Sequence, residues 1–129
     1  MNVEIDEFSK MDMQHKQLGE IVKAVCQVLN NGQGPIEFSG NLNRLVEFTR
    51  FHFIEEEDFM RCHTYEGLES HKRIHEMLLK KLVELREKTF IFDEKSKARM
   101  LSFLEKDFSY HFVEDKHAWK NLQLRKGLV

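Results

Sequence analysis

The sequence predicts an all-α fold, an antiparallel up-and-down four-helix bundle. In four separate segments, apolar residues recur at a period of about 3.6, the spacing of one helix face. Only short breaks separate these segments, and the chain contains one proline in 129 residues. Short connections are typical of neighbouring antiparallel helices. A chain of this length also fits one hydrophobic core, so we expect residues 1–129 to form a single domain.

The first two predicted helices flank the strongest break signal in the chain. The apolar stripe before the break consists of Leu18, Ile21, Val22, Val25 and Leu29. The break spans residues 30–35 (NNGQGP), where two glycines and the only proline favour a turn. After it, the helical period continues through Leu42, Leu45, Thr49, His52, Glu56 and Phe59. These residues predict two helices joined by a turn.

The third and fourth helices follow two weaker breaks. Residues 62–67 form the first of them, and the stripe after it consists of Leu68, His71, His75, Leu78, Leu82 and Leu85. Residues 89–93 are predicted to form a connection. Asp93 is the expected N-cap of the next helix, because aspartate accepts hydrogen bonds from backbone N–H groups of a first turn. The fourth stripe consists of Leu101, Leu104, Phe108, His111 and Asp115.

On each predicted helix, polar residues occupy part of the face that should point into the core. The polar residues on these faces are His15, one turn before Leu18, and His52, Glu56, His71, His75, His111 and Asp115. Residues four apart on a helix project to one side, so three pairs of these residues can each direct two groups to one point. Each unpaired buried polar group costs about 1–3 kcal/mol, whereas a whole domain is stable by about 5–15 kcal/mol. Bound metal ions would remove this cost.

The ligand types narrow the choice of metal. Five imidazoles and two carboxylates exceed what one tetrahedral zinc ion needs, and they suit two metal ions with bridging carboxylates. The set contains no thiolate, which argues against zinc–sulfur and iron–sulfur sites. Imidazole combined with carboxylate is compatible with iron.

Three segments resemble motifs of the hemerythrin family, including its bacterial members. Residues 12–18 (DMQHKQL) resemble the family's D-x-Q-H-K-x-L opening, and residues 52–60 (HFIEEEDFM) resemble H-F-x-x-E-E followed by a hydrophobic pair. Residues 65–75 (YEGLESHKRIH) resemble Y-x-x-L-x-x-H-K-x-x-H. The likeness extends over roughly residues 3 to 122.

The resemblance implies a hemerythrin-like bundle that holds two iron ions, joined by an oxo or hydroxo group, and binds dioxygen reversibly. It implies that one iron is held by His71, His75 and His111. It implies His15 and His52 on the second iron, which keeps an open position for dioxygen, and Glu56 as a bridging carboxylate. Storage, delivery and sensing of dioxygen all remain open as roles.

The spacing at the second bridging carboxylate departs from the family. The family pattern is H-x-x-x-x-D, but the fifth residue after His111 is Lys116 and the fourth is Asp115. Regular helical spacing places Asp115 on the His111 face, so we expect Asp115 to bridge the irons. The alternative is that the second bridge is absent or supplied by another group.

Other functions and partners agree less well with these features. The main alternative is a di-iron redox enzyme that acts on peroxide or nitric oxide; a further one is an iron-responsive or structural module. We expect a non-enzyme, with at most weak peroxidase or oxidase side activity, because histidines dominate the predicted site. A net charge of −2 gives no reason to expect nucleic acid. The absence of a long apolar run or signal-peptide pattern predicts a cytoplasmic protein without a membrane partner, and a monomer is compatible with the sequence.

Several polar residues near the motifs are expected to have no role in the site. Their phases on the helix predict that Glu55, Glu57 and Asp58 are solvated. His63 and His117 are expected to be surface or loop residues rather than ligands.

Overall fold

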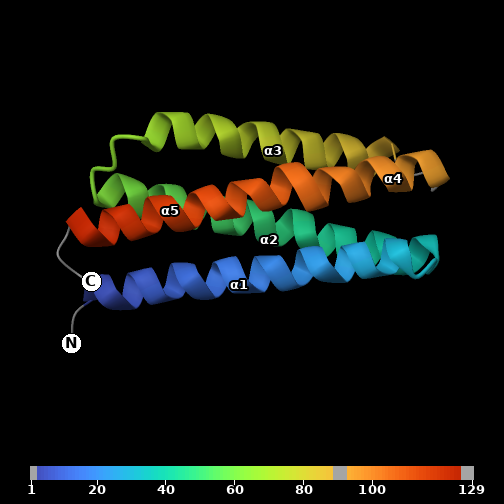
Figure 1. The fold of residues 1–129 in the computed structure, drawn as a ribbon, viewed down its shortest axis with the longest axis horizontal. Coiled ribbons are helices and arrows are strands. Elements are labelled where there is room, and N and C mark those ends of the chain that lie inside the picture. Colours follow the sequence, from blue (N-terminus) through green and yellow to red (C-terminus); the bar gives the residue numbers. More distant parts are fainter. Residues whose placement is uncertain (1–2, 89–92, 126–129) are drawn as a thin grey trace.

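The computed structural model describes residues 3–88 and 93–125, and within them the side chains other than those of residues 3–7, 112, 116 and 123. These ranges contain α1 (Val3–Asn30), α2 (Pro35–Cys62), α3 (Leu68–Lys88), α4 (Glu94–Ser102), a π-helical segment η2 (Phe103–Phe108) and α5 (Ser109–Arg125). The last three elements follow one another directly and form one rod (Figure 1). The predicted connection at residues 89–93 lies, except for Asp93, outside the described residues.

The four rods run in alternating directions, as predicted for an up-and-down bundle (Figure 1). Helix α1 packs against α2, α2 against α3, and α3 against α4, while α1 also contacts α4 and α5. Asp93 is the N-cap of α4, because its carboxylate accepts a hydrogen bond from the Ser96 backbone N–H at 2.7 Å. Among the described residues, no helix is both long and apolar enough to cross a lipid bilayer.

The core has two apolar clusters, one on each side of the polar level. The larger cluster occupies the end of the bundle near the α1–α2 turn and includes Leu18, Leu42, Leu82 and Phe108. The smaller, which we call the aromatic cluster, lies at the other end and contains Phe8, Met11, Phe59, Met60, Trp119 and Leu122. The polar side chains are therefore separated from water along the bundle axis in both directions.

The π-helical segment adjusts the register of the fourth rod. Buried residues in this rod step by four twice, from Met100 through Leu104 to Phe108, and in a regular α-helix each such step drifts by about 40°. A π-helix has i→i+5 hydrogen bonds and a wider turn, so it compensates for this drift. The Ser109 hydroxyl donates to the Leu104 carbonyl, five residues earlier, at 2.8 Å. As a result, His111 and Asp115 still face the core.

Two turns at the ends of helices use a left-handed residue. After α1, Gly32 has φ 69°, and the Gln33 N–H donates to the Val28 carbonyl at 3.2 Å. After α2, Thr64 takes the same position with φ 54°, and the Tyr65 N–H donates to the Met60 carbonyl at 2.9 Å. Both turns have the hydrogen bond of a Schellman motif, in which glycine is the usual left-handed residue. A β-branched residue in this conformation is strained.

Replacement of Thr64 by glycine should relieve this strain. We expect Thr64→Gly to raise the free energy of unfolding by up to about 1 kcal/mol, because the steric gain exceeds the entropic cost of glycine. Urea unfolding of the metal-free protein measures the change. Thr64→Ala keeps a Cβ atom and should gain less; a less stable Thr64→Gly protein would contradict the assignment of strain.

Candidate metal centre

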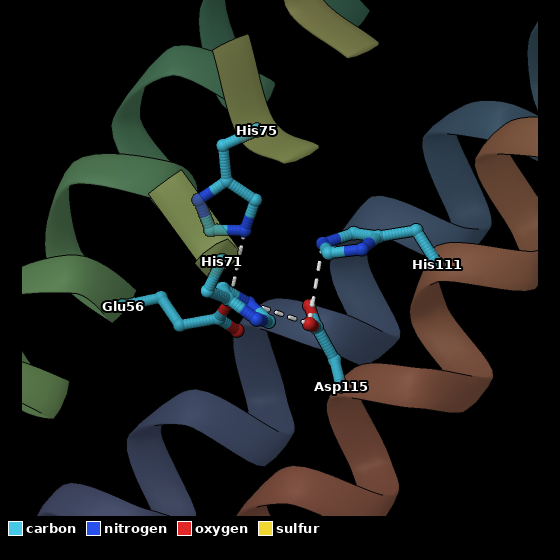
Figure 2. Close-up of side chains that lie close together, drawn as sticks. All are labelled: Glu56, His71, His75, His111 and Asp115. Carbon is cyan, nitrogen blue, oxygen red and sulfur yellow. Dashed lines mark hydrogen bonds and ion pairs between the residues drawn. The ribbon is translucent and has the colours of Figure 1, made fainter. Parts of the chain in front are cut away.

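The bundle brings all seven predicted polar residues together between the two apolar clusters. Every one of these side chains belongs to a residue that is at most 8% exposed. Their nitrogen and oxygen atoms form two groups, and within each group the atoms lie within 4.8 Å of one another. The first group contains Glu56, His71, His75, His111 and Asp115 (Figure 2); the second contains His15, His52, Glu56 and Asp115. The two carboxylates thus belong to both groups.

The two oxygens of the Glu56 carboxylate face different groups of histidines. Oε1 lies 2.7 Å from Nε2 of His71 and 3.1 Å from Nε2 of His75. Oε2 lies 2.7 Å from Nε2 of His15 and 3.2 Å from Nε2 of His52. One oxygen therefore faces each group, as a bridging carboxylate requires.

Asp115 has a similar arrangement from the opposite rod. Its Oδ1 lies 2.8 Å from Nε2 of His71 and 3.2 Å from Nε2 of His111 (Figure 2). Its Oδ2 lies 3.5 Å from Nε2 of His15. The four-residue spacing from His111 thus directs this carboxylate into the centre. The Lys116 side chain lies outside the described residues. This placement favours Asp115 over the alternative of a missing second carboxylate.

Two further residues orient the imidazoles, and the sequence patterns did not identify either role. Nδ1–H of His52 donates to Oε1 of Gln14 at 2.8 Å, and Nδ1–H of His75 donates to Oε2 of Glu57 at 2.7 Å. A proton on Nδ1 leaves the Nε2 lone pair free to face the centre. The prediction that Glu57 is solvated is wrong: its side chain is 19% exposed, because the end of α2 packs beside His75 of α3.

The remaining predictions about nearby residues mostly hold. Asp58 is exposed and pairs with Arg61 at 2.7 Å. Glu55 is only partly exposed, because it pairs with Lys10 of α1 at 2.8 Å. His117 is exposed. His63 lies in the turn after α2, as expected for a loop residue, but it is buried, with its ring centroid 4.3 Å from that of Phe59. Neither histidine belongs to the two groups.

The polar atoms at the centre fit bound metal ions. In the part of the chain that the structure describes, Nε2 of His52, His75 and His111 and both oxygens of Asp115 are buried without a hydrogen-bond partner. Such atoms are costly in a protein core, and their lone pairs are those that a metal ion uses. The donors are imidazole and carboxylate, which suits iron among the transition metals. Both cysteines are free thiols outside the two groups.

Without metal, two other histidines of the centre, His15 and His71, bind protons more strongly than a free imidazole. Burial lowers the pKa of His15, but the adjacent carboxylates of Asp115 and Glu56 outweigh burial and raise that pKa to about 9. His71 experiences the same opposing effects, and its pKa rises to about 10. Burial and the charge of Glu56 raise the pKa of Asp115, but the adjacent imidazoles of His111, His15 and His71 prevail and hold it at about 2. Imidazolium–carboxylate pairs therefore stabilise the metal-free centre.

The comparison with known proteins agrees with this geometry. The family model described as the Hemerythrin HHE cation binding domain matches residues 6–120. The chain belongs to the hemerythrin family. A bacteriohemerythrin of Clostridium acetobutylicum is 30% identical over 117 residues, which cover 84% of this chain and 91% of that hemerythrin.

Two further relatives match over about half of their length. A myohemerythrin of Theromyzon tessulatum is 35% identical over 68 residues, covering 53% of this chain and 51% of the relative. One of the hemerythrin subunits of Sipunculus nudus is 36% identical over 75 residues, covering 58% of this chain and 56% of the relative. No solved structure matches the chain significantly.

The raised histidine pKa values predict that the metal-free protein is less stable in alkali. His15 and His71 contribute stability that is complete below their unfolded pKa of 6.5 and is lost as pH rises through about 9 and about 10. The loss should be on the order of a few kcal/mol. Asp115 acts oppositely, because its contribution is lost as pH falls from 3.8 through about 2.

Urea unfolding between pH 3 and 10 tests this dependence. We expect maximal stability of the metal-free protein between about pH 4 and 6.5. A stability that stays constant from pH 6.5 to 10 would show that the imidazolium–carboxylate pairs do not form.

The bond between Glu57 and His75 should strengthen metal binding. Glu57→Gln leaves the shape of the side chain but removes its charge, so we expect metal affinity to fall by about 10–100-fold, as for other partners of metal-bound histidines. Anaerobic titration with Fe(II) measures the affinity. Asp58→Asn removes a charge from the exposed neighbouring position and should leave the affinity unchanged; equal losses in both variants would indicate a general charge effect.

Proposed function

We propose that this hemerythrin-family protein binds dioxygen reversibly at a di-iron centre. The sharing of Glu56 and Asp115 between two groups of unequal size supports this proposal most strongly. Three histidines accompany the carboxylates in one group, but only His15 and His52 do so in the other. The second iron would therefore keep a position for an external ligand. The relatives that match this chain are named as hemerythrins, which supports iron and dioxygen among the possible metals and ligands.

The centre combines a charged interior with dry surroundings. When bound, an iron pair supplies a reversible two-electron donor. Two carboxylates would balance part of the charge of the iron pair. Imidazole binds metal in its neutral form and would add no charge. Gln14 and Glu57 keep the Nδ1 protons of His52 and His75 in place. The chain thereby supplies fixed ligands without placing a mobile proton on the Nε2 atoms of His52 and His75.

A ring of buried side chains closes one side of the centre. Each member lies three residues from a histidine of its own rod, toward the larger apolar cluster, and the members are Leu18, Thr49, Leu78 and Phe108. The ring of Phe53 stacks on His75 with centroids 3.7 Å apart, and the aromatic cluster closes the opposite side. Exclusion of water and protons from such a site disfavours oxidative side reactions, which supports reversible binding over turnover.

Absorption spectra of anaerobically prepared Fe(II) protein, recorded before and after addition of air, test the proposal. We expect a visible charge-transfer band that appears with air and disappears on removal of oxygen. The band should be lost in Asp115→Asn, which removes a shared negative charge, and retained in Glu114→Gln, its exposed neighbour.

Two results would contradict reversible binding. One is immediate, irreversible oxidation of the wild-type protein to a stable ferric form. The other is sustained consumption of peroxide or nitric oxide, which would support the redox enzyme instead.

A further inference from the structure

Trp119 connects the aromatic cluster directly to the centre. Its indole N–H donates to Oε2 of Glu56 at 3.0 Å, and the two residues are 3% and 0% exposed. Trp119 lies one turn beyond Asp115 on α5, so it reaches Glu56 from across the bundle. We propose that Trp119 is a positioning residue that holds the Glu56 carboxylate with one oxygen toward each metal position. This role rests on the proposed two-metal centre.

The indole is itself held in place by neighbouring rings. The Phe59 ring packs edge-on against it with centroids 4.6 Å apart, and the Phe8 ring does so at 5.7 Å. These contacts come from α2 and α1, so three rods fix the indole. A buried aromatic side chain in such packing has few alternative orientations. The N–H group therefore presents a fixed direction to Glu56.

The hydrogen bond restrains rotation of the Glu56 carboxylate. An ionised carboxylate oxygen has two lone pairs, and the indole occupies one on Oε2. The other faces His15 and His52, whose Nε2 atoms lie 2.7 and 3.2 Å away. If the carboxylate rotated, a buried N–H group would lose its partner, which is unfavourable. The bond thus keeps Oε2 directed at the His15–His52 group.

The two carboxylates differ in this support. Among the described residues, both oxygens of Asp115 lack a hydrogen-bond partner, whereas Oε2 of Glu56 has a donor that is not itself a candidate ligand. Because the indole touches only the oxygen that faces His15 and His52, its loss should affect that metal position and spare the His71–His75–His111 position.

Nuclear magnetic resonance can observe the bond directly, because Trp119 is the only tryptophan in the chain. A ¹H–¹⁵N spectrum of the wild-type protein should show one indole signal, protected from exchange with water. Zn(II), which is diamagnetic, should shift this signal when it occupies the His15–His52 position and draws electron density from Oε2. A rapidly exchanging indole proton, or a signal that does not move during the titration, would overturn the role.

Titration of Trp119→Phe with Zn(II) tests the consequence for metal binding. We expect the affinity for one of the two Zn(II) ions to fall by about 10-fold or more, as for loss of other hydrogen bonds to metal ligands. The affinity for the other Zn(II) ion should be unchanged. The weakened equivalent should be the one lost in His15→Ala. Leu122→Ala is the control, since it removes buried volume from the aromatic cluster but keeps the indole N–H and both rings that pack against it, and it should leave both affinities unchanged.

The possible results separate this role from the centre itself. Equal weakening of both equivalents in Trp119→Phe, or equal effects of Trp119→Phe and Leu122→Ala, would show that Trp119 only packs in the aromatic cluster and would overturn its positioning role. Wild-type protein that binds fewer than two equivalents would overturn the two-metal centre and this role with it.

Discussion

Seven polar side chains are buried at one level of this bundle, and the rest of the structure depends on how their burial is compensated. Two carboxylates cannot satisfy five imidazoles through good hydrogen bonds alone, and several Nε2 atoms and the Asp115 oxygens have no such bond among the described residues. At about 1–3 kcal/mol for each unpaired group, the cost approaches the whole stability of a domain. Protons on His15 and His71 reduce this cost without metal, and two metal ions would remove it.

The surrounding residues hold this polar level in one arrangement. Gln14 and Glu57 orient imidazoles through their Nδ1 protons, and Trp119 restrains the Glu56 carboxylate. Apolar clusters on both sides exclude water, which strengthens each of these hydrogen bonds. The π-helical segment also contributes to this arrangement, because it corrects the register of the fourth rod just before His111 and Asp115. The site therefore depends on backbone geometry as well as on ligand identity.

Helical periodicity was sufficient to predict the four rods and the seven inward-facing polar residues, because both are properties of a single helix face. Contacts between helices were harder to predict. Glu57 follows the core residue Glu56 on α2, so its position around the helix predicts a side chain exposed to solvent. In the folded bundle, however, α3 places His75 beside it. Trp119 continues the spacing of His111 and Asp115, but the sequence does not show that Glu56 lies within its reach. The π-helical segment was missed because the predicted stripe began at Leu101, and its steps of three and four residues are those of an ordinary α-helix. In the structure Met100 is buried instead, and Leu101 is only partly buried.

Mössbauer spectroscopy of the oxidised, iron-loaded protein tests most directly whether two irons share Glu56 and Asp115. Two ferric ions joined by bridging groups couple antiferromagnetically, so we predict two quadrupole doublets with a diamagnetic ground state at low temperature. The inequality of the two ligand groups should make the doublets distinct. A magnetically split spectrum from isolated high-spin ferric ions would contradict a shared centre.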